Sequence, residues 1–268
     1  MKVIKTLGVG VLIASLTACT TNPITGRSSL QLSNNSELMS MAAQEYKTTL
    51  SKAKVITGTA DANRVITVGN RIKAAAEKYY QSIGRSSDLA GYAWEFKLVQ
   101  EDQVNAWCMP GGKVAVYTGI LPVTKDETGL AVVLGHEISH ALAGHGNERI
   151  SQQQVAQIGG SLLGSTISNS QMSGIFEKLY PIGAQVGLLS YGRKQELEAD
   201  QMGLYLMAMA GYDPRQAIPF WKRMQASSSG VRTPEFLSTH PGPENRISAL
   251  NNYMEKALQY YVAAGGKR

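Results

Sequence analysis

Three residues near the middle of the chain could together perform hydrolytic chemistry. The segment His136-Glu137-Ile138-Ser139-His140 contains two of the 4 histidines in a chain of 268 residues. If it is helical, His136 and His140 lie one turn apart on one face, with Glu137 beside them. Two imidazoles at this spacing bind a zinc ion, and the glutamate serves as general base for a water that the metal activates. The motif therefore predicts a catalytic zinc site.

A catalytic zinc site usually has three protein ligands, so a third must come from elsewhere in the chain. The variant with a third histidine six positions after His140 is excluded, because Gly146 stands there. Glu196 and Asp200 are spaced one helical turn apart in a later amphipathic segment. We expect Glu196 to be the third ligand and Asp200 to accept the free ring N–H of a ligating histidine.

Two other residues near these motifs are expected to lie outside the site. If the helix continues beyond His140, His145 falls about 180° around it from His136, which predicts a helix-end or surface histidine. Glu198 is turned about 160° from Glu196 on its own helix, so we expect it to be a surface charge.

The elements that must position these residues follow from caps and periodicity. Asp126 and Glu127 precede an apolar stretch at 130–134, which predicts the start of the helix that carries the histidines. Residues 151–190 separate the two halves of the site and predict two helices, either a packed hairpin or a lid over the cleft. Further helices are expected at 36–51, 60–80, 214–225 and 243–261, and strands at 92–99 and 113–118.

Four patterns follow one another along the chain: the segment 105–119, His136-Glu137-x-x-His140 with Gly144-His145, Glu196-x-x-Ala199-Asp200, and Ser238-Thr239-His240-Pro241. Together they resemble zinc metallopeptidase family 48, which includes the HtpX membrane proteases and the CAAX prenyl proteases. The chain is most similar to its periplasmic lipoprotein branch, the LoiP and BepA type. The resemblance covers roughly residues 60–250. It implies an α+β fold, a mainly helical gluzincin-like domain with a small β-sheet bordering the cleft, and one Zn2+ per chain.

The resemblance also assigns roles to two other segments. In the family, the segment 105–119 includes a strand that borders the cleft, and we expect an extended substrate to pair with Lys113, Val114, Ala115 and Val116 by main-chain hydrogen bonds. His240 has two open interpretations. It either acts catalytically by donating a hydrogen bond to the oxyanion of the tetrahedral intermediate, or it occupies the open zinc position and holds the enzyme inactive, as the BepA-type resemblance suggests.

The N-terminus has the pattern of a targeting segment. Lys2 and Lys5 precede a short apolar stretch, and Leu16-Thr17-Ala18-Cys19 resembles a bacterial lipobox. The apolar stretch is too short to span a bilayer. We expect a signal peptide at 1–18, lipidation of Cys19, a tether at 19–35 and a single metallopeptidase domain at 36–268. Thr20 after the cysteine favours the outer membrane, facing the periplasm of a bacterial cell envelope.

Charge and cysteine content exclude several other classes. The formal net charge is +6, but the basic residues are scattered, which argues against a nucleic-acid-binding protein. With Cys19 lipidated, Cys108 is the one remaining thiol, so no disulfide framework is expected within the chain.

The function that this sequence predicts is zinc-dependent hydrolysis of peptide bonds. The resemblance implies unfolded or misassembled envelope proteins as substrates and outer-membrane assembly machinery as a partner. An alternative is a latent or non-cleaving, chaperone-like assembly factor whose zinc site is closed by His240. The glutamate at 137 favours the enzyme, because a structural zinc site needs no general base.

Overall fold

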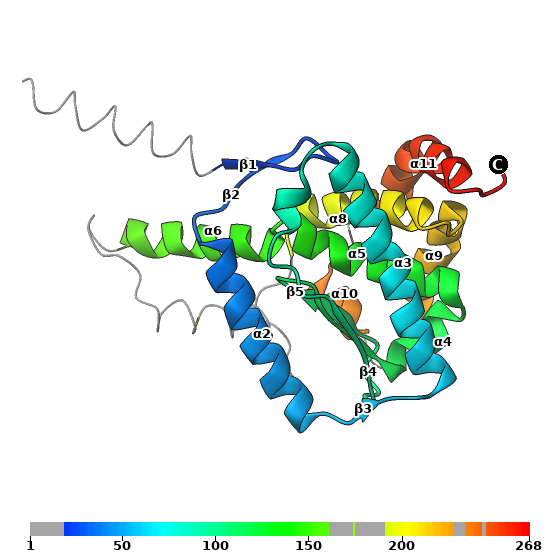
Figure 1. Cartoon of the computed structure of the whole chain (residues 1–268), viewed down its shortest axis with the longest axis horizontal. Coiled ribbons are helices and arrows are strands. Elements are labelled where there is room, and N and C mark those ends of the chain that lie inside the picture. The colour runs from blue at the N-terminus through cyan, green and yellow to red at the C-terminus, as the bar shows by residue number, and fades with distance from the viewer. Residues whose placement is uncertain (1–18, 161–173, 175–190, 228–233, 243–244) are drawn as a thin grey trace, which may run out of the picture.

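Helices make up most of the computed structural model, which describes residues 19–160, 174, 191–227, 234–242 and 245–268. A four-stranded sheet lies between α2 (Asn35–Lys52) on one face and the pair α3 (Ala60–Ser82) and α5 (Glu127–Leu142) on the other (Figure 1). Alternate side chains of the strand Lys113–Tyr117 point to opposite faces of the sheet. Val114 and Val116 join the main core, while Ala115 and Tyr117 belong to a smaller cluster on the other face. The expected mainly helical α+β fold is confirmed.

The sheet has the strand order β3-β4-β6-β5. Its strands are β3 (Val55–Ile56), β4 (Glu95–Val99), β5 (Ala106–Met109) and β6 (Lys113–Tyr117). β6 pairs in parallel with β4 on one side and antiparallel with β5 on the other. β6 is therefore an internal strand, and β5 forms an edge in the described part of the chain.

Two buried helices bring the site together at the centre of the fold. α8 (Arg193–Met209) packs along α5, and a Cβ added to Gly135 would lie 2.8 Å from the carbonyl oxygen of Gly203. A Cβ on Gly203 would in turn lie 2.8 Å from the backbone nitrogen of His136. The two backbones can approach this closely only because both positions are glycine. This contact sets the first histidine of the motif directly beside α8.

The remaining elements follow the expected periodicity with small shifts. α2 begins one residue before the expected helix at 36–51 and is capped by Asn34, whose side chain accepts from the Ser36 N–H. The strand expected at 92–99 begins at Glu95, and much of the segment 151–190 lies outside the described residues. The other elements are η1 (Ser86–Leu89), η2 (Thr118–Ile120), α4 (Leu121–Thr124), α6 (His145–Gly160), η3 (Pro214–Gln216), α9 (Ala217–Ala226), α10 (Glu235–Thr239) and α11 (Arg246–Ala263).

The segment expected to be a tether is ordered in the structure. Strands β1 (Cys19–Thr21) and β2 (Ser28–Leu30) form an antiparallel hairpin. Its turn contacts α6 and α8 through Arg27, which pairs with Glu148 at 2.7 Å and also with Glu198. These ion pairs with two buried acids hold the turn of the hairpin against α6 and α8.

Cys19 is exposed at the start of this hairpin, whereas Cys108 is buried in the core, and the two do not form a disulfide with each other. Among the described residues, none of the helices combines the length and the apolar character that crossing a bilayer requires.

Candidate zinc active site

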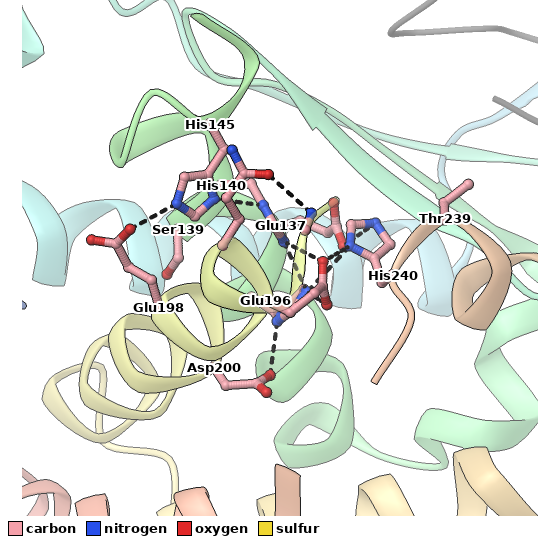
Figure 2. A network of polar contacts seen from close by, with 12 residues as sticks. Glu137, Ser139, His140, His145, Glu196, Glu198, Asp200, Thr239 and His240 are labelled. Atoms are coloured by element: carbon pink, nitrogen blue, oxygen red, sulfur yellow. Dashed lines mark hydrogen bonds and ion pairs between the residues drawn. The ribbon is translucent and has the colours of Figure 1, made fainter. Parts of the chain in front are cut away.

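Four side chains from three separate elements converge in the buried interior. One ligand atom from each of His136, His140, Glu196 and His240 lies within 4.8 Å of the others. Nε2 of His136 and Nε2 of His140 are 3.0 Å apart, and each is 3.4 Å from an oxygen of Glu196. Figure 2 shows Glu137, His140, Glu196 and His240 turned toward one another. The structure thus brings together the three residues that the sequence predicts as zinc ligands.

The donor set suits a zinc ion. Two imidazole nitrogens and one carboxylate form the protein part of many catalytic zinc sites. The Nε2 atoms of His136 and His140 both face the cluster, and the opposite Nδ1 atoms hydrogen bond to other residues. Ligating histidines are commonly held in this way, because the second hydrogen bond sets the tautomer and the ring orientation.

Asp200 holds the ring of His136 as expected. Its Oδ1 lies 3.0 Å from Nδ1 of His136, so the ring N–H points to the carboxylate and Nε2 stays free for a metal. The other oxygen of Asp200 accepts from Nε of Arg246 at 2.6 Å. Asp200 belongs to the same helix that supplies Glu196, one turn further along.

Arg246, at the start of α11, is a site residue that the sequence analysis missed. Besides Asp200, it donates from Nη2 to Glu196 at 2.6 Å, and its guanidinium lies 3.9 Å above the ring of Trp221. Burial opposes the charge on Glu196, yet His240 and His136 hold the pKa of this carboxyl well below its usual range. One signal was available in the sequence: two buried acids one turn apart need a cation near them.

Glu137 is placed to move a proton. The side chain is buried, and its Oε1 has no hydrogen-bond partner among the described residues. Burial raises the pKa of Glu137, which the nearby His240 and His136 partly offset. The backbone of Cys108, on the edge strand β5, hydrogen bonds to the same carboxylate. A carboxyl with a raised pKa and an oxygen that accepts no hydrogen bond in the described structure is suited to accept and return a proton.

His240 follows α10 and enters the ligand cluster itself. Its Nδ1 lies 3.1 Å from Oε1 of Glu196 and 3.3 Å from Nε2 of His136, while its Nε2 lies 3.4 Å from Oε1 of Glu137. Stacking on Phe236 and Tyr191 holds the ring in this place. One nitrogen therefore faces the metal position and the other faces the candidate general base.

The expectations for His145 and Glu198 are wrong. His145 is fully buried and its Nδ1 lies 2.8 Å from Nδ1 of His140, because α5 ends at Leu142 and the turn at Gly144 redirects the chain. Glu198 is 4% exposed and accepts from Nε2 of His145 at 2.9 Å. Burial lowers the pKa of His145, so the ring is neutral and offers one donor and one acceptor.

The expected substrate-binding strand is also wrong. Lys113, Val114, Ala115 and Val116 belong to β6, whose main-chain groups pair with β4 and β5 on both sides. A peptide cannot add to a strand that is already fully paired. The described sheet has two edge strands, β3 and β5, and β5 is the one whose backbone hydrogen bonds to Glu137, through Cys108.

An H-E-x-x-H helix with a glutamate from a second helix defines the glutamate type of zinc peptidase. The chain belongs to peptidase family M48, whose family model matches residues 68–254. Members of this family use zinc, and the cluster of His136, His140, Glu196 and His240 is able to hold it. The expected family and cofactor are confirmed.

Relatives show how far the similarity extends. The chain is 36% identical over 201 residues to the mitochondrial metalloendopeptidase OMA1 of Arabidopsis thaliana. It is 32% identical over 194 residues to the beta-barrel assembly-enhancing protease of Yersinia pestis, and 29% identical over 261 residues to the mitochondrial metalloendopeptidase OMA1 of Homo sapiens. These matches cover 72%, 69% and 89% of this chain, but only 39%, 37% and 46% of the relatives. The chain thus spans less than half the length of each of these proteins.

Proposed function

We propose that this chain is a zinc-dependent endopeptidase that hydrolyses peptide bonds in unfolded or misassembled proteins of the bacterial cell envelope. The observation that carries the proposal is the convergence of two imidazoles and a carboxylate next to a buried glutamate whose Oε1 accepts no hydrogen bond from the described residues. The family supports the reaction class, and the relative named as a beta-barrel assembly-enhancing protease supports the envelope as the place of action.

Each residue of the site has a defined task in this reaction. His136, His140 and Glu196 would hold a zinc ion, which when bound would supply a Lewis acid for the scissile carbonyl and the attacking water. Glu137 takes the proton of the water and passes it to the leaving amine. An extended substrate adds to the edge strand β5, and main-chain pairing of this kind requires little side-chain preference. Digestion of unfolded casein, with and without a zinc chelator, tests the proposal: cleavage that persists in the metal-free protein would contradict it.

A latent state with His240 on the metal is the second candidate function. It is favoured by the position of His240 Nδ1, which lies 3.1 Å from Glu196 and 3.3 Å from His136, among the ligand atoms. Three histidines and a glutamate make a closed four-ligand site with no open position for water. In this state the protein binds envelope proteins without cleaving them and acts as an assembly factor.

Replacing His240 by alanine distinguishes the two functions. If His240 holds the site closed, we expect casein cleavage by His240→Ala to rise at least about tenfold above wild type, because the open position becomes available. If His240 stabilises the oxyanion, the same variant loses about 10²–10³-fold in kcat. Initial rates of both proteins on the same fluorescent casein, at equal zinc content, give the answer. No cleavage by either protein would favour the non-cleaving assembly factor.

We also propose that Cys19 carries the lipid that attaches the protein to the outer membrane. The residue is exposed at the start of the β1–β2 hairpin. Replacing Cys19 by serine removes the acylated thiol, so the variant is expected to leave the membrane fraction and to lose label from radioactive palmitate. The buried Cys108→Ser variant is the matched control and should keep both properties. A Cys19→Ser protein that still sediments with membranes and takes up label would rule out this anchor.

A further inference from the structure

A continuous hydrogen-bond network joins the N-terminal hairpin to the candidate metal ligand His140. We propose that Arg27 is a positioning residue for the zinc site, acting through Glu198 and His145 on the ring of His140. The inference rests on the proposed zinc site and assigns a task to the segment Asn22-Pro23-Ile24-Thr25-Gly26-Arg27, which lies outside the family match at 68–254.

The donor and acceptor roles in this network follow from the candidate metal ligand His140 outward. His140 offers Nε2 to the cluster, so its proton is on Nδ1 and points to Nδ1 of His145 at 2.8 Å. His145 must then accept at Nδ1 and carry its own proton on Nε2, which points to Glu198 at 2.9 Å. Figure 2 shows His140, His145 and Glu198 in this order. The arrangement requires Glu198 to be an ionised acceptor.

Two hairpin residues keep Glu198 in place as that acceptor. Thr25 donates its hydroxyl to Oε1 of Glu198 at 2.5 Å, and Arg27 donates from Nε to Oε2. The far end of Arg27 makes a bidentate pair with Glu148 at 2.8 and 2.7 Å, and Gln195 donates to the same carboxylate at 2.8 Å. A guanidinium bound at both ends has a defined direction, which an ammonium could not reproduce.

The turn of the hairpin presents Arg27 and Thr25 in the required direction. The side chain of Asn22 accepts from the backbone of Ile24 at 2.9 Å, and Asn22 exchanges main-chain hydrogen bonds with Gly26 and Arg27 at 2.9 Å. Gly26 has φ +76°, a conformation that favours glycine. The amide of Asn22 also reaches Sδ of Met202 on α8 at 2.9 Å. This turn and α8 are therefore held together at two points, through Met202 and Glu198.

His136 has a comparable support on the other side of the site, from Asp200 and Arg246. An acid of α8 that is paired with a distant arginine thus orients each histidine, directly for His136 and through His145 for His140. Loss of Arg27 would leave Glu198 buried with weaker fixation, and the ring of His140 would lose its defined orientation. Zinc affinity is the property that reports this, because supporting residues of this kind typically change metal affinity by about 10–100-fold.

The test measures the zinc dissociation constant of the purified full chain by competition with a chromophoric chelator, together with the visible spectrum of the Co2+-substituted protein. We expect Arg27→Gln to weaken zinc binding about tenfold and to alter the Co2+ bands, with Arg27→Lys restoring the affinity only in part. In a Glu198→Ala background, Arg27→Gln should have no additional effect. Arg85→Gln is the matched control, because Arg85 touches the same hairpin at the carbonyl of Thr21 but does not contact Glu198.

The outcomes separate this inference from the proposed function. Unchanged zinc affinity and Co2+ spectrum in Arg27→Gln would overturn the inference alone, as would an undiminished effect in the Glu198→Ala background. A wild-type chain that binds no zinc would overturn the proposed function too. If Arg27→Gln does not fold, Arg27→Lys decides: it keeps a positive charge beside Glu198 and Glu148 but loses the fixed direction of the guanidinium, and wild-type zinc affinity in that variant contradicts the inference.

Discussion

Replacing Glu137 by glutamine is expected to abolish peptide hydrolysis while leaving zinc bound. The amide has nearly the same shape as the carboxylate but cannot accept the proton of the attacking water, and positioned general bases contribute about 10²–10⁴-fold to rate. Glu137 is suited to this task because burial raises its pKa and its Oε1 has no hydrogen-bond partner in the described structure. The rate of fluorescent casein cleavage tests the loss of hydrolysis, and the zinc content per chain of the same preparations tests whether the metal stays bound.

Glu127→Gln is the matched control for this variant. Glu127 lies in the first turn of the same helix α5, but its side chain is 47% exposed and pairs loosely with Arg71 at 3.8 Å. The control should keep wild-type activity, because an exposed pair of this kind contributes little. A Glu137→Gln protein that cleaves casein at the wild-type rate would show that another residue is the base. Loss of zinc in the same variant would instead assign Glu137 a role in metal binding.

Of the substitutions proposed for this protein, Arg246→Leu is expected to lower the free energy of unfolding most. The guanidinium is 1% exposed and donates at 2.6 Å to both Glu196 and Asp200, so its removal leaves two buried carboxylates without their cation. Breaking a buried pair in this way typically costs about 3–5 kcal/mol. Urea unfolding of the metal-free protein, followed by circular dichroism, measures the change. Because Arg246 also orients Glu196, we expect the zinc affinity of the folded variant to fall as well.

Arg268→Leu controls for the loss of an arginine as such. Arg268 pairs with Glu255 at 2.6 Å, but both side chains are more than 60% exposed, so the urea midpoint should stay the same. If Arg246→Leu unfolds at the wild-type midpoint, the two acids do not need the cation, and the account of this part of the site is incorrect.

The ligand triad could be predicted because each part of it depends on geometry within one helix. The spacing of His136 and His140 sets them on one face, and Glu196 and Asp200 follow the same one-turn rule. The sequence does not show that α5 and α8 pack against each other, which the site also requires. In the structure, the two helices pack closely at Gly135 and Gly203, which brings the histidines and Glu196 together.

The predictions for His145 and Glu198 are wrong because helical periodicity holds only within one helix. It does not apply beyond the end of that helix, and it does not show which distant segments cover its surface. His145 points away from the site only if the helix continues beyond His140. The helix instead ends at Leu142, and Gly144 at φ +67° turns the chain back toward the site. Glu198 was expected to be exposed, but Arg27 lies 171 positions away in sequence and covers it. Neither contact has a periodic signal, because the partners belong to different elements.

The sequence by itself determined the chemistry of this protein: which residues can bind zinc, which one can serve as base, and the helical turns that pair them. The tertiary structure alone decided which residues support them. It placed Arg246 and Arg27 against the acids of α8, made β6 an internal strand rather than a substrate edge, and set His240 among the ligand atoms. The physical reason is that spacing along a helix follows from local backbone geometry, whereas strand order and buried ion pairs depend on how distant segments pack together.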